Sequence, residues 1–293
     1  MTRSGFVALA GRPNVGKSTL LNRIVGQKVA IASERPQTTR RAIRGVATGQ
    51  DWQAVLVDLP GVQRPRDPLT ERMQQRMRRE LEAADAALFI LNGQQRVGPG
   101  DRFIAQAIAA AGSACVTAVN KIDLLDRAGA ARALAAAGAL GAEGEIFPVS
   151  ARTGAGVGEL VEGLVALLPE GPLLYPAGEA TDLPEHVRIA ELVREQALRR
   201  TREEVPHAVE AHVEEVEERP DGLLVVTVRL WAETESQKGI LIGAGGRMVR
   251  EVGTAARREI EAMLGRRVHL ELSVRARPGW RGDEALLDRL GIE

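Results

Sequence analysis

The chain has 293 residues with 39 basic and 39 acidic side chains, so its zero formal net charge points to no particular partner. Its length suggests two domains, with cores built mainly from Ala, Val, Leu and Ile because aromatic residues make up only 3%. The single cysteine cannot form an internal disulfide. No apolar run approaches the roughly 20 residues that span a bilayer, and the N-terminus does not resemble a secretory leader. We therefore expect a cytoplasmic protein.

The first predicted element is a phosphate-binding loop, Gly11–Thr19, which fits the pattern Gly, four residues, Gly-Lys-Ser/Thr. The apolar run Phe6–Ala10 predicts a buried strand before it, and Leu20–Val25 predicts a helix after it. Backbone N–H groups at such a helix N-terminus favour a polyphosphate. We expect Lys17 to contact the terminal phosphates and Ser18 to bind Mg²⁺. The predicted nucleotide-binding residues here are Gly11, Arg12, Pro13, Asn14, Val15, Gly16, Lys17, Ser18 and Thr19.

Two threonines, Thr38 and Thr39, follow in a polar segment without periodicity. At this place after a phosphate loop, one of the two hydroxyls is expected to reach the bound metal, and the sequence leaves open which. We predict that Thr39 is the metal ligand, and that Lys17, Thr39 and Gly61 form the catalytic set.

Ala42–Thr48 and Gln53–Asp58 predict two strands joined as a hairpin. The second strand runs into Asp58, Leu59, Pro60 and Gly61, where the carboxylate is expected to hold Mg²⁺ and the glycine N–H to meet a γ-phosphate.

An amphipathic helix is predicted by the four-residue spacing of Leu69, Met73, Met77 and Leu81, with the apolar stripe packed on the sheet. Further strands are predicted at Ala86–Leu91 and Ala114–Val119, around a helix at Asp101–Ala111. This alternation predicts a doubly wound α/β domain with a mostly parallel sheet.

A base-recognition loop is predicted at Asn120, Lys121, Ile122 and Asp123, directly after a buried strand. The Asp123 carboxylate can accept hydrogen bonds from N1–H and the exocyclic amine of guanine, which adenine does not offer in that geometry. We expect Asn120 to tie this loop to the phosphate loop and Lys121 to lie along the base. After a short strand at Ile146–Val149, Ser150 and Ala151 follow, and the Ala151 N–H is expected to donate to the guanine carbonyl.

A segment rich in proline and glycine, Pro169–Pro184, predicts a domain boundary. We therefore expect a nucleotide-binding domain at 1–170, a linker at 171–184, a second α+β domain at 185–282 and a short terminal helix at 283–293. The second domain is predicted to run helix, two strands, two helices around a glycine loop, and strand.

Gly243–Gly246 fits the Gly-x-x-Gly loop with which KH domains grip single-stranded nucleic acid. Residues 238–281 hold ten basic and four acidic side chains, whereas residues 182–235 hold seven and fourteen, which predicts one nucleic-acid face and one repelling face. Trp280 is expected either to stack on a base or to pack on its own domain. The predicted RNA-binding residues are Lys238, Gly239, Ile242, Gly243, Ala244, Gly245, Gly246, Arg247 and Arg250.

These motifs, in this order over the whole chain, resemble the bacterial Era-type GTPases, which combine a P-loop GTPase domain with a C-terminal type II KH domain. The resemblance implies GTP and GDP binding with Mg²⁺, hydrolysis of GTP, and a monomer. It also implies binding near the 3′ end of 16S ribosomal RNA in maturation of the 30S subunit, and peripheral association with the cytoplasmic face of the inner membrane. The alternative function is a membrane-associated cell-cycle regulatory GTPase.

Two residues refine the expected mechanism. Val62 stands where signalling GTPases carry a water-orienting glutamine, so intrinsic hydrolysis is expected to be slow. Asn14 is similar to an asparagine that holds K⁺ in some such GTPases, which suggests acceleration by K⁺. Two alternative hypotheses remain. One is a P-loop ATPase or kinase, which the predicted guanine recognition by Asp123 disfavours, and the other is an RNA-binding scaffold whose nucleotide is only structural.

Overall fold

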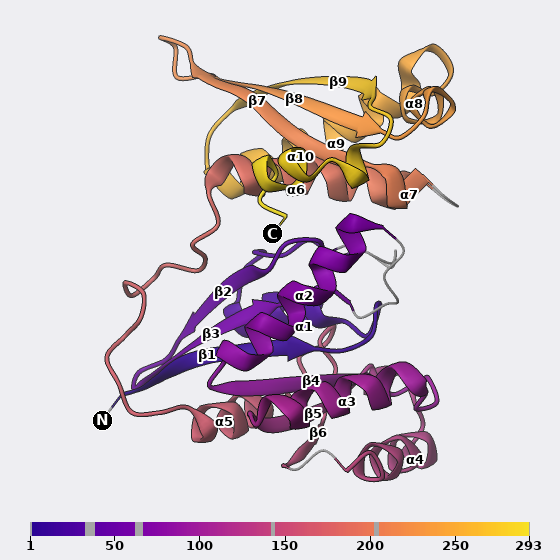
Figure 1. The fold of residues 1–293 in the computed structure, drawn as a ribbon. Helices are drawn as coiled ribbons and strands as arrows, with labels where there is room; N and C mark the ends of the chain where they lie inside the picture. The colour runs from indigo at the N-terminus through magenta and orange to yellow at the C-terminus, as the bar shows by residue number, and fades with distance from the viewer. Residues whose placement is uncertain (1, 33–38, 62–66, 142–143, 202–204, 293) are drawn as a thin grey trace.

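The computed structural model describes residues 2–32, 39–61, 67–141, 144–201 and 205–292, which form two layered units joined by an irregular segment (Figure 1). The first unit has helices on both faces of a six-stranded sheet, and the second has helices packed on one face of a three-stranded sheet. The predicted fold class is confirmed.

The strands of the first unit lie in the order β2-β3-β1-β4-β5-β6, and β2 alone runs antiparallel to its neighbour. The carboxyl ends of β1, β3, β4 and β5 therefore meet at one edge, where open α/β sheets bind ligands. The elements are β1 (Arg3–Ala10), α1 (Lys17–Val25), β2 (Ile43–Thr48), β3 (Trp52–Asp58), α2 (Pro68–Ala83), β4 (Ala86–Asn92), α3 (Pro99–Ala111), β5 (Ala114–Asn120), α4 (Arg127–Gly138), β6 (Ile146–Pro148) and α5 (Val157–Leu167).

The second unit places β7 antiparallel and β9 parallel to the central strand β8. Its main elements follow the order predicted from the sequence, with a short unpredicted helix between α6 and β7, and α6, α9 and the sheet share one apolar core. The elements are α6 (Glu185–Arg200), α7 (Val205–Ala208), β7 (Glu210–Glu218), β8 (Leu224–Ala232), α8 (Glu235–Ile242), η2 (Ala244–Gly246), α9 (Arg247–Leu264), β9 (Val268–Ala276), η3 (Trp280–Gly282) and α10 (Glu284–Arg289).

The joining segment lies along the β2–β3 edge of the first sheet. The Gln53 side chain accepts hydrogen bonds from the N–H groups of Leu174 and Tyr175, and the Thr181 hydroxyl donates to Arg44 O. Further along, Arg44 pairs with Asp182 at 3.1 Å. The segment is therefore fastened to the first unit almost up to the start of α6.

An apolar cluster joins the two units at the position of the C-terminal helix, which lies between them (Figure 1). Leu69 and Met73 of α2 belong to this cluster, whereas Met77 and Leu81 pack on the sheet. The prediction that the whole stripe packs on the sheet is wrong in its first two positions. The remaining members of the cluster are Trp231, Trp280, Leu286, Leu287, Leu290 and Ile292.

Trp280 is fully buried in this cluster and donates from its indole nitrogen to Ala208 O at 3.1 Å. The Arg40 guanidinium lies over its ring, 5.2 Å from the centroid. Of the two roles predicted for Trp280, packing is therefore confirmed and base stacking is wrong, since no face of the ring is open to a base.

A cluster of buried ion pairs lies beside the apolar cluster. Arg40 bonds Glu210 at 2.6 Å, and Arg41 bonds Glu191 at 2.5 Å and Glu210 at 3.2 Å. Arg194 also pairs with Glu191, at 2.6 Å. Glu191 and Glu210, from the acidic first half of the second unit, thus bind arginines of the first unit, because each buried charge needs an opposite partner. Glu214, Glu215, Glu217 and Glu218 of β7 are exposed, so the repelling face stays a prediction.

Prediction on pH. Burial alone would raise the pKa of Glu210, but the guanidiniums of Arg41, Arg40 and Arg194 outweigh it and hold the pKa at about 2, below the ordinary 4.5. A carboxyl with a depressed folded-state pKa stabilises the fold above its unfolded pKa and loses that contribution as the pH falls towards the folded value. We expect Glu210→Gln to lower the free energy of unfolding by roughly 3 kcal/mol at neutral pH.

The difference between the two proteins should shrink as the pH falls from 4.5 towards 2, measured by urea unfolding. Glu217→Gln, at an exposed position of the same strand, is the matched control. A difference that stays constant with pH contradicts this assignment.

Candidate functional site

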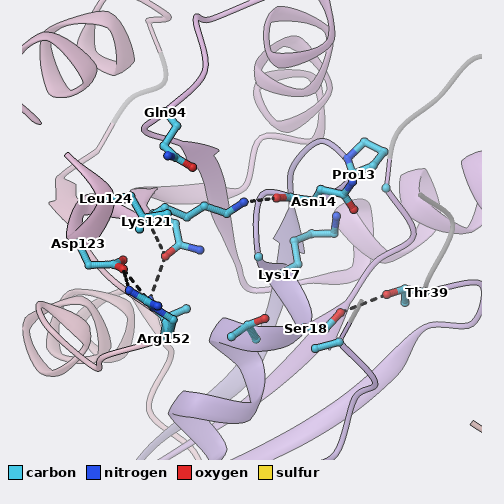
Figure 2. Close-up of a pocket in the computed structure, with 16 residues that line it drawn as sticks. Pro13, Asn14, Lys17, Ser18, Thr39, Gln94, Lys121, Asp123, Leu124 and Arg152 are labelled. Atoms are coloured by element: carbon cyan, nitrogen blue, oxygen red, sulfur yellow. Dashed lines mark hydrogen bonds and ion pairs between the residues drawn. The ribbon is translucent and has the colours of Figure 1, made fainter. Parts of the chain in front are cut away.

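A cavity of about 650 Å³ opens at the carboxyl edge of the first sheet (Figure 2). Its volume falls within the range of small-molecule sites. Phosphate-loop residues line one end, and the loops after β5 and β6 line the other, so the predicted phosphate and base motifs lie in one cavity. The lining residues are Pro13, Asn14, Gly16, Lys17, Ser18, Thr19, Ala32, Thr39, Gly61, Gln94, Asn120, Lys121, Asp123, Leu124, Ala151 and Arg152.

The phosphate end is built by backbone conformations that few residues adopt. Gly16 has φ 103°, and an added Cβ would lie 2.3 Å from the Asn120 side-chain nitrogen, so only glycine fits. Gly61 packs against Pro13, whose backbone nitrogen lies 3.1 Å from where a Cβ would stand. The Lys17 ammonium is buried and donates to Gly11 O at 3.1 Å, which holds it beside the loop.

Oxygen atoms of three side chains converge beside Lys17. Ser18 Oγ donates to Asp58 Oδ2 at 2.6 Å, Thr39 Oγ1 donates to the same oxygen at 3.1 Å, and the two hydroxyls lie 3.3 Å apart. Asp58 Oδ1 is buried without a hydrogen-bond partner among the described residues. Hydroxyl and carboxylate oxygens suit Mg²⁺, which takes few protein ligands and keeps several waters. The donor set therefore fits the predicted ion.

Burial shapes the charges at this end. Desolvation raises the pKa of Asp58 and lowers the pKa of Lys17, and each shift is opposed by the charge of the other group. A cation arriving beside Asp58 would favour its ionised form, because an opposite charge nearby lowers the pKa of a carboxyl.

The base end is organised by Asn120. Its side-chain nitrogen donates to Val15 O at 2.8 Å, and its oxygen accepts from the N–H groups of Lys121 and Ala151, at 2.8 and 2.9 Å. One buried amide thus connects the phosphate loop to both base loops, as the sequence predicted for the first of these contacts. The Ala151 N–H, predicted to donate to guanine, has Asn120 as its partner in this structure.

The Asp123 carboxylate lies at the far end of the cavity (Figure 2). It accepts from the Ser150 hydroxyl at 2.6 Å and from the Arg152 Nη2 at 2.6 Å. These two groups lower the pKa of Asp123, so it is an anion at neutral pH and accepts hydrogen bonds only. Lys121 reaches back across the cavity to Asn14 O at 2.9 Å.

Some predicted site residues lie behind the cavity wall. Val15, Asp58 and Leu59 are buried, and Arg12 turns away to pair with Asp101 at 2.9 Å. Gly11, Pro60 and Ser150 also lie outside the lining set. Thr38 and Val62 lie outside the described residues.

Four lining residues were missed by sequence reasoning, namely Ala32, Gln94, Leu124 and Arg152. Three of them could have been identified from their positions in the sequence. Gln94 follows the carboxyl end of β4, and Leu124 and Arg152 directly follow predicted motifs. Ala32 could not be identified in this way, because a small apolar residue in a loop carries no chemistry.

The glycine loop of the second unit joins α8 to α9. Gly243, Gly245 and Gly246 all have positive φ, and an added Cβ on Gly243 would lie 2.7 Å from the Met248 Cβ. Arg250 closes the loop by donating to Gly245 O at 2.8 Å. A Cβ added at Gly239 would meet open space, as it would at Gly245 and Gly246, so a backbone can approach this side closely.

Within the described residues, no helix is both long and apolar enough to cross a membrane. The same part of the chain holds no group of three or more His, Cys, Asp or Glu side chains arranged to bind a metal. The candidate Mg²⁺ site differs from such groups because two of its three oxygen donors are hydroxyls.

Two protein families match the chain. Residues 6–121 match the family described as 50S ribosome-binding GTPase, and residues 204–281 match the KH domain family. Together with the cavity and the glycine loop, these matches define the class: a P-loop GTPase domain followed by a KH domain.

Relatives specify the class further. The protein named GTPase Era of Mycolicibacterium paratuberculosis is 47% identical and that of Mycolicibacterium smegmatis 46%, each aligned over 99% of both chains. The chain belongs to the Era family of GTPases. Hydrolysis of GTP is therefore its reaction, and the ATPase, kinase and scaffold readings are excluded.

Two solved structures share the fold over the whole chain. Era in complex with MgGDPNP and nucleotides 1506–1542 of 16S ribosomal RNA superimposes with a TM-score of 0.95 at 36% identity, covering 100% of this chain and 99% of that one. A variant of Aquifex aeolicus Era bound to GDP and AlF4⁻ gives the same TM-score and identity over 99% of both chains.

Prediction on base choice. Asp123→Asn replaces one acceptor oxygen by an N–H donor. This donor would meet the exocyclic amine of guanine, which is also a donor, whereas it could donate to the 2-carbonyl of xanthine. We expect the affinity for GTP to fall roughly a hundredfold and the affinity for xanthosine triphosphate to rise, as measured by competition against a fluorescent nucleotide. Asp126→Asn is the control, because asparagine replaces the N-cap of α4 equally well. Unchanged preference for GTP in Asp123→Asn would contradict the assignment.

Proposed function

We propose that this GTPase binds the 3′ region of 16S ribosomal RNA through the loop Gly243–Gly246 and assists maturation of the 30S subunit. The observation that carries the proposal is the joint presence of the nucleotide cavity and the glycine loop in a fold that superimposes throughout on an Era–MgGDPNP–RNA complex. The relatives do not favour the alternative, a membrane-associated cell-cycle regulator.

In the proposed reaction, Ser18, Thr39 and Asp58 would hold Mg²⁺, which would supply positive charge to the phosphate oxygens. Lys17 neutralises the terminal phosphates, and the Gly61 N–H donates to the γ-phosphate when it is present. Asp123 selects guanine, and Asn120 keeps the base loops in register with the phosphate loop. GTP thereby orders the segment at Thr39, and hydrolysis releases it.

The proposed domain boundaries are 1–170 for the nucleotide-binding domain, 171–184 for the linker, 185–282 for the RNA-binding domain and 283–293 for the terminal helix. We take the monomer as the functional state. Peripheral membrane association rests on the family resemblance alone, and co-sedimentation with liposomes in the absence of RNA tests it.

Prediction on RNA. Ala244 is exposed between the glycines, where a phosphate of the bound strand would approach. Ala244→Asp places a carboxylate there, and we expect the RNA affinity to fall about tenfold or more, because like charges repel. Ala244→Asn is the control, having the same shape without the charge. Binding is measured by fluorescence anisotropy with an RNA matching nucleotides 1506–1542 of 16S ribosomal RNA.

The same titration compares GDP with a non-hydrolysable GTP analogue. Tighter binding with the analogue is expected. Equal affinities in the two nucleotide states would remove the proposed control by nucleotide.

Prediction on K⁺. Asn14 lines the cavity with φ 65°, so Asn14→Gly removes the side chain without straining the backbone. We propose that its side chain helps hold K⁺ beside the phosphates, where a cation stabilises the transition state. Hydrolysis is expected to be about tenfold faster or more in K⁺ than in Na⁺ buffer, and Asn14→Gly should lose the difference. Equal rates of the unaltered protein in both buffers would reject the K⁺ site.

A further inference from the structure

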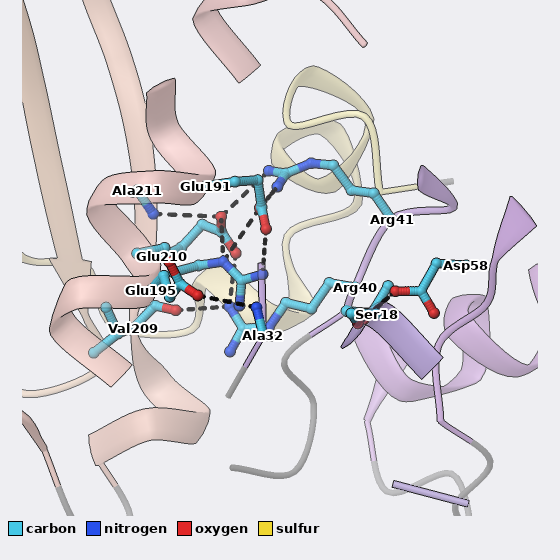
Figure 3. Close-up of polar contacts among 12 residues, drawn as sticks. Ser18, Ala32, Arg40, Arg41, Asp58, Glu191, Glu195, Val209, Glu210 and Ala211 are labelled. Carbon is cyan, nitrogen blue, oxygen red and sulfur yellow. Dashed lines mark hydrogen bonds and ion pairs between the residues drawn. The ribbon is translucent and has the colours of Figure 1, made fainter. Parts of the chain in front are cut away.

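Two arginines directly after Thr39 anchor it to the second unit. Figure 3 shows Arg40 and Arg41 reaching away from Ser18 and Asp58 into carboxylates of α6 and β7. Arg40 also donates to Val209 O at 2.7 Å, and Arg41 Nε donates to Leu290 O at 2.6 Å. The Arg40 and Glu210 side chains are both completely buried. The position of Thr39 is therefore fixed from the second unit as well as from Asp58.

The other end of the same segment is held in a similar way. Ala32 lines the nucleotide cavity, and its N–H donates to Glu195 Oε1 of α6 at 3.0 Å. The Glu195 side chain is completely buried and also forms an ion pair with Lys28. Arg199, one turn further along α6, donates to the same Oε1 at 3.0 Å and orients the carboxylate.

We propose that Glu195 and Glu210 of the second unit are positioning residues for GTP hydrolysis. They hold the two described ends of the segment from Ala32 to Thr39, and so place the Thr39 hydroxyl at the metal side of the cavity. This inference rests on the proposed role of Thr39 as a Mg²⁺ ligand.

Burial makes the connection stiff. The Arg40 guanidinium and the Glu210 carboxylate are both completely buried and lie 2.6 Å apart. A buried charge deprived of its partner is strongly unfavourable, so Arg40 must follow Glu210 if the second unit moves. Adjacent Cα atoms are about 3.8 Å apart, so Thr39 must move with Arg40.

The coupling works in both directions. If the contact with Glu210 favours the inward position of Thr39, then a γ-phosphate that draws Thr39 inward must favour the contact with Glu210 by the same free energy. GDP lacks the γ-phosphate, so the effect should appear in the ratio of GTP affinity to GDP affinity. A simple loss of stability would not change this ratio.

The test uses the full chain with Glu195→Ala and Glu210→Ala made separately. Each is expected to lower the single-turnover rate of GTP hydrolysis roughly tenfold and to reduce the GTP-to-GDP affinity ratio, with GDP affinity unchanged. Glu217→Gln, exposed on β7, is the matched control and should behave like the unaltered protein. Thermal unfolding identifies a variant that does not fold. In that case the other glutamate variant tests the inference.

Thr39→Ala distinguishes this inference from the proposed function beneath it. If Thr39→Ala loses hydrolysis while both glutamate variants keep the normal rate and affinity ratio, the positioning role is overturned and the metal site stands. If Thr39→Ala hydrolyses GTP normally with an unchanged Mg²⁺ requirement, the proposed metal site itself fails.

Discussion

A buried guanidinium must keep a carboxylate beside it, and this constraint governs how the two units of the chain are joined. Arg40 and Arg41 are carried by the loop that follows Thr39, while Glu191 and Glu210 belong to the second unit. An apolar interface alone would allow the surfaces to slide. Paired charges without access to water permit few relative positions, because most displacements leave an ion unpaired. The nucleotide end of this loop and the KH domain therefore share one set of contacts.

In the nucleotide cavity, too, a few buried polar groups each contact several partners. One amide, that of Asn120, meets the phosphate loop and both base loops. Beside the phosphate loop, the charges of Lys17 and Asp58 oppose the pKa shift that burial causes in each other, and the Ser18 and Thr39 hydroxyls donate to Asp58. A buried polar group satisfied by several backbone partners is rigid, so the distance between the phosphate and base ends is set before nucleotide arrives.

Motifs with fixed chemistry were predictable from the sequence, and contacts between distant segments were not. The strand before the loop Gly11–Thr19 and the helix after it were predictable from the local spacing of residue types, as was the order of the main elements in the second unit. The helix Arg127–Gly138 was missed because its alanine-rich sequence buries only Ala137 and shows no apolar stripe. Leu69 and Met73 continue the stripe of α2, so periodicity could not reveal that they face another domain. Likewise, the sequence alone predicts solvated charges at Arg40 and Arg41, because their partners lie 150 residues away for Arg41–Glu191 and 170 for Arg40–Glu210.

The linker's attachment to the β2–β3 edge limits the range of domain motion. Its contacts continue through Thr181 and Asp182, and α6 begins at Glu185, so only Leu183 and Pro184 separate the last anchor from the next rigid element. Proline has a fixed φ near −65°, which removes one of the few free rotations. A tether of two residues reaches only about 7 Å. A reorientation of the KH domain that keeps these contacts must then be a rotation about this pivot, and release of the buried ion pairs would rotate the domain in place rather than separate it from the first unit.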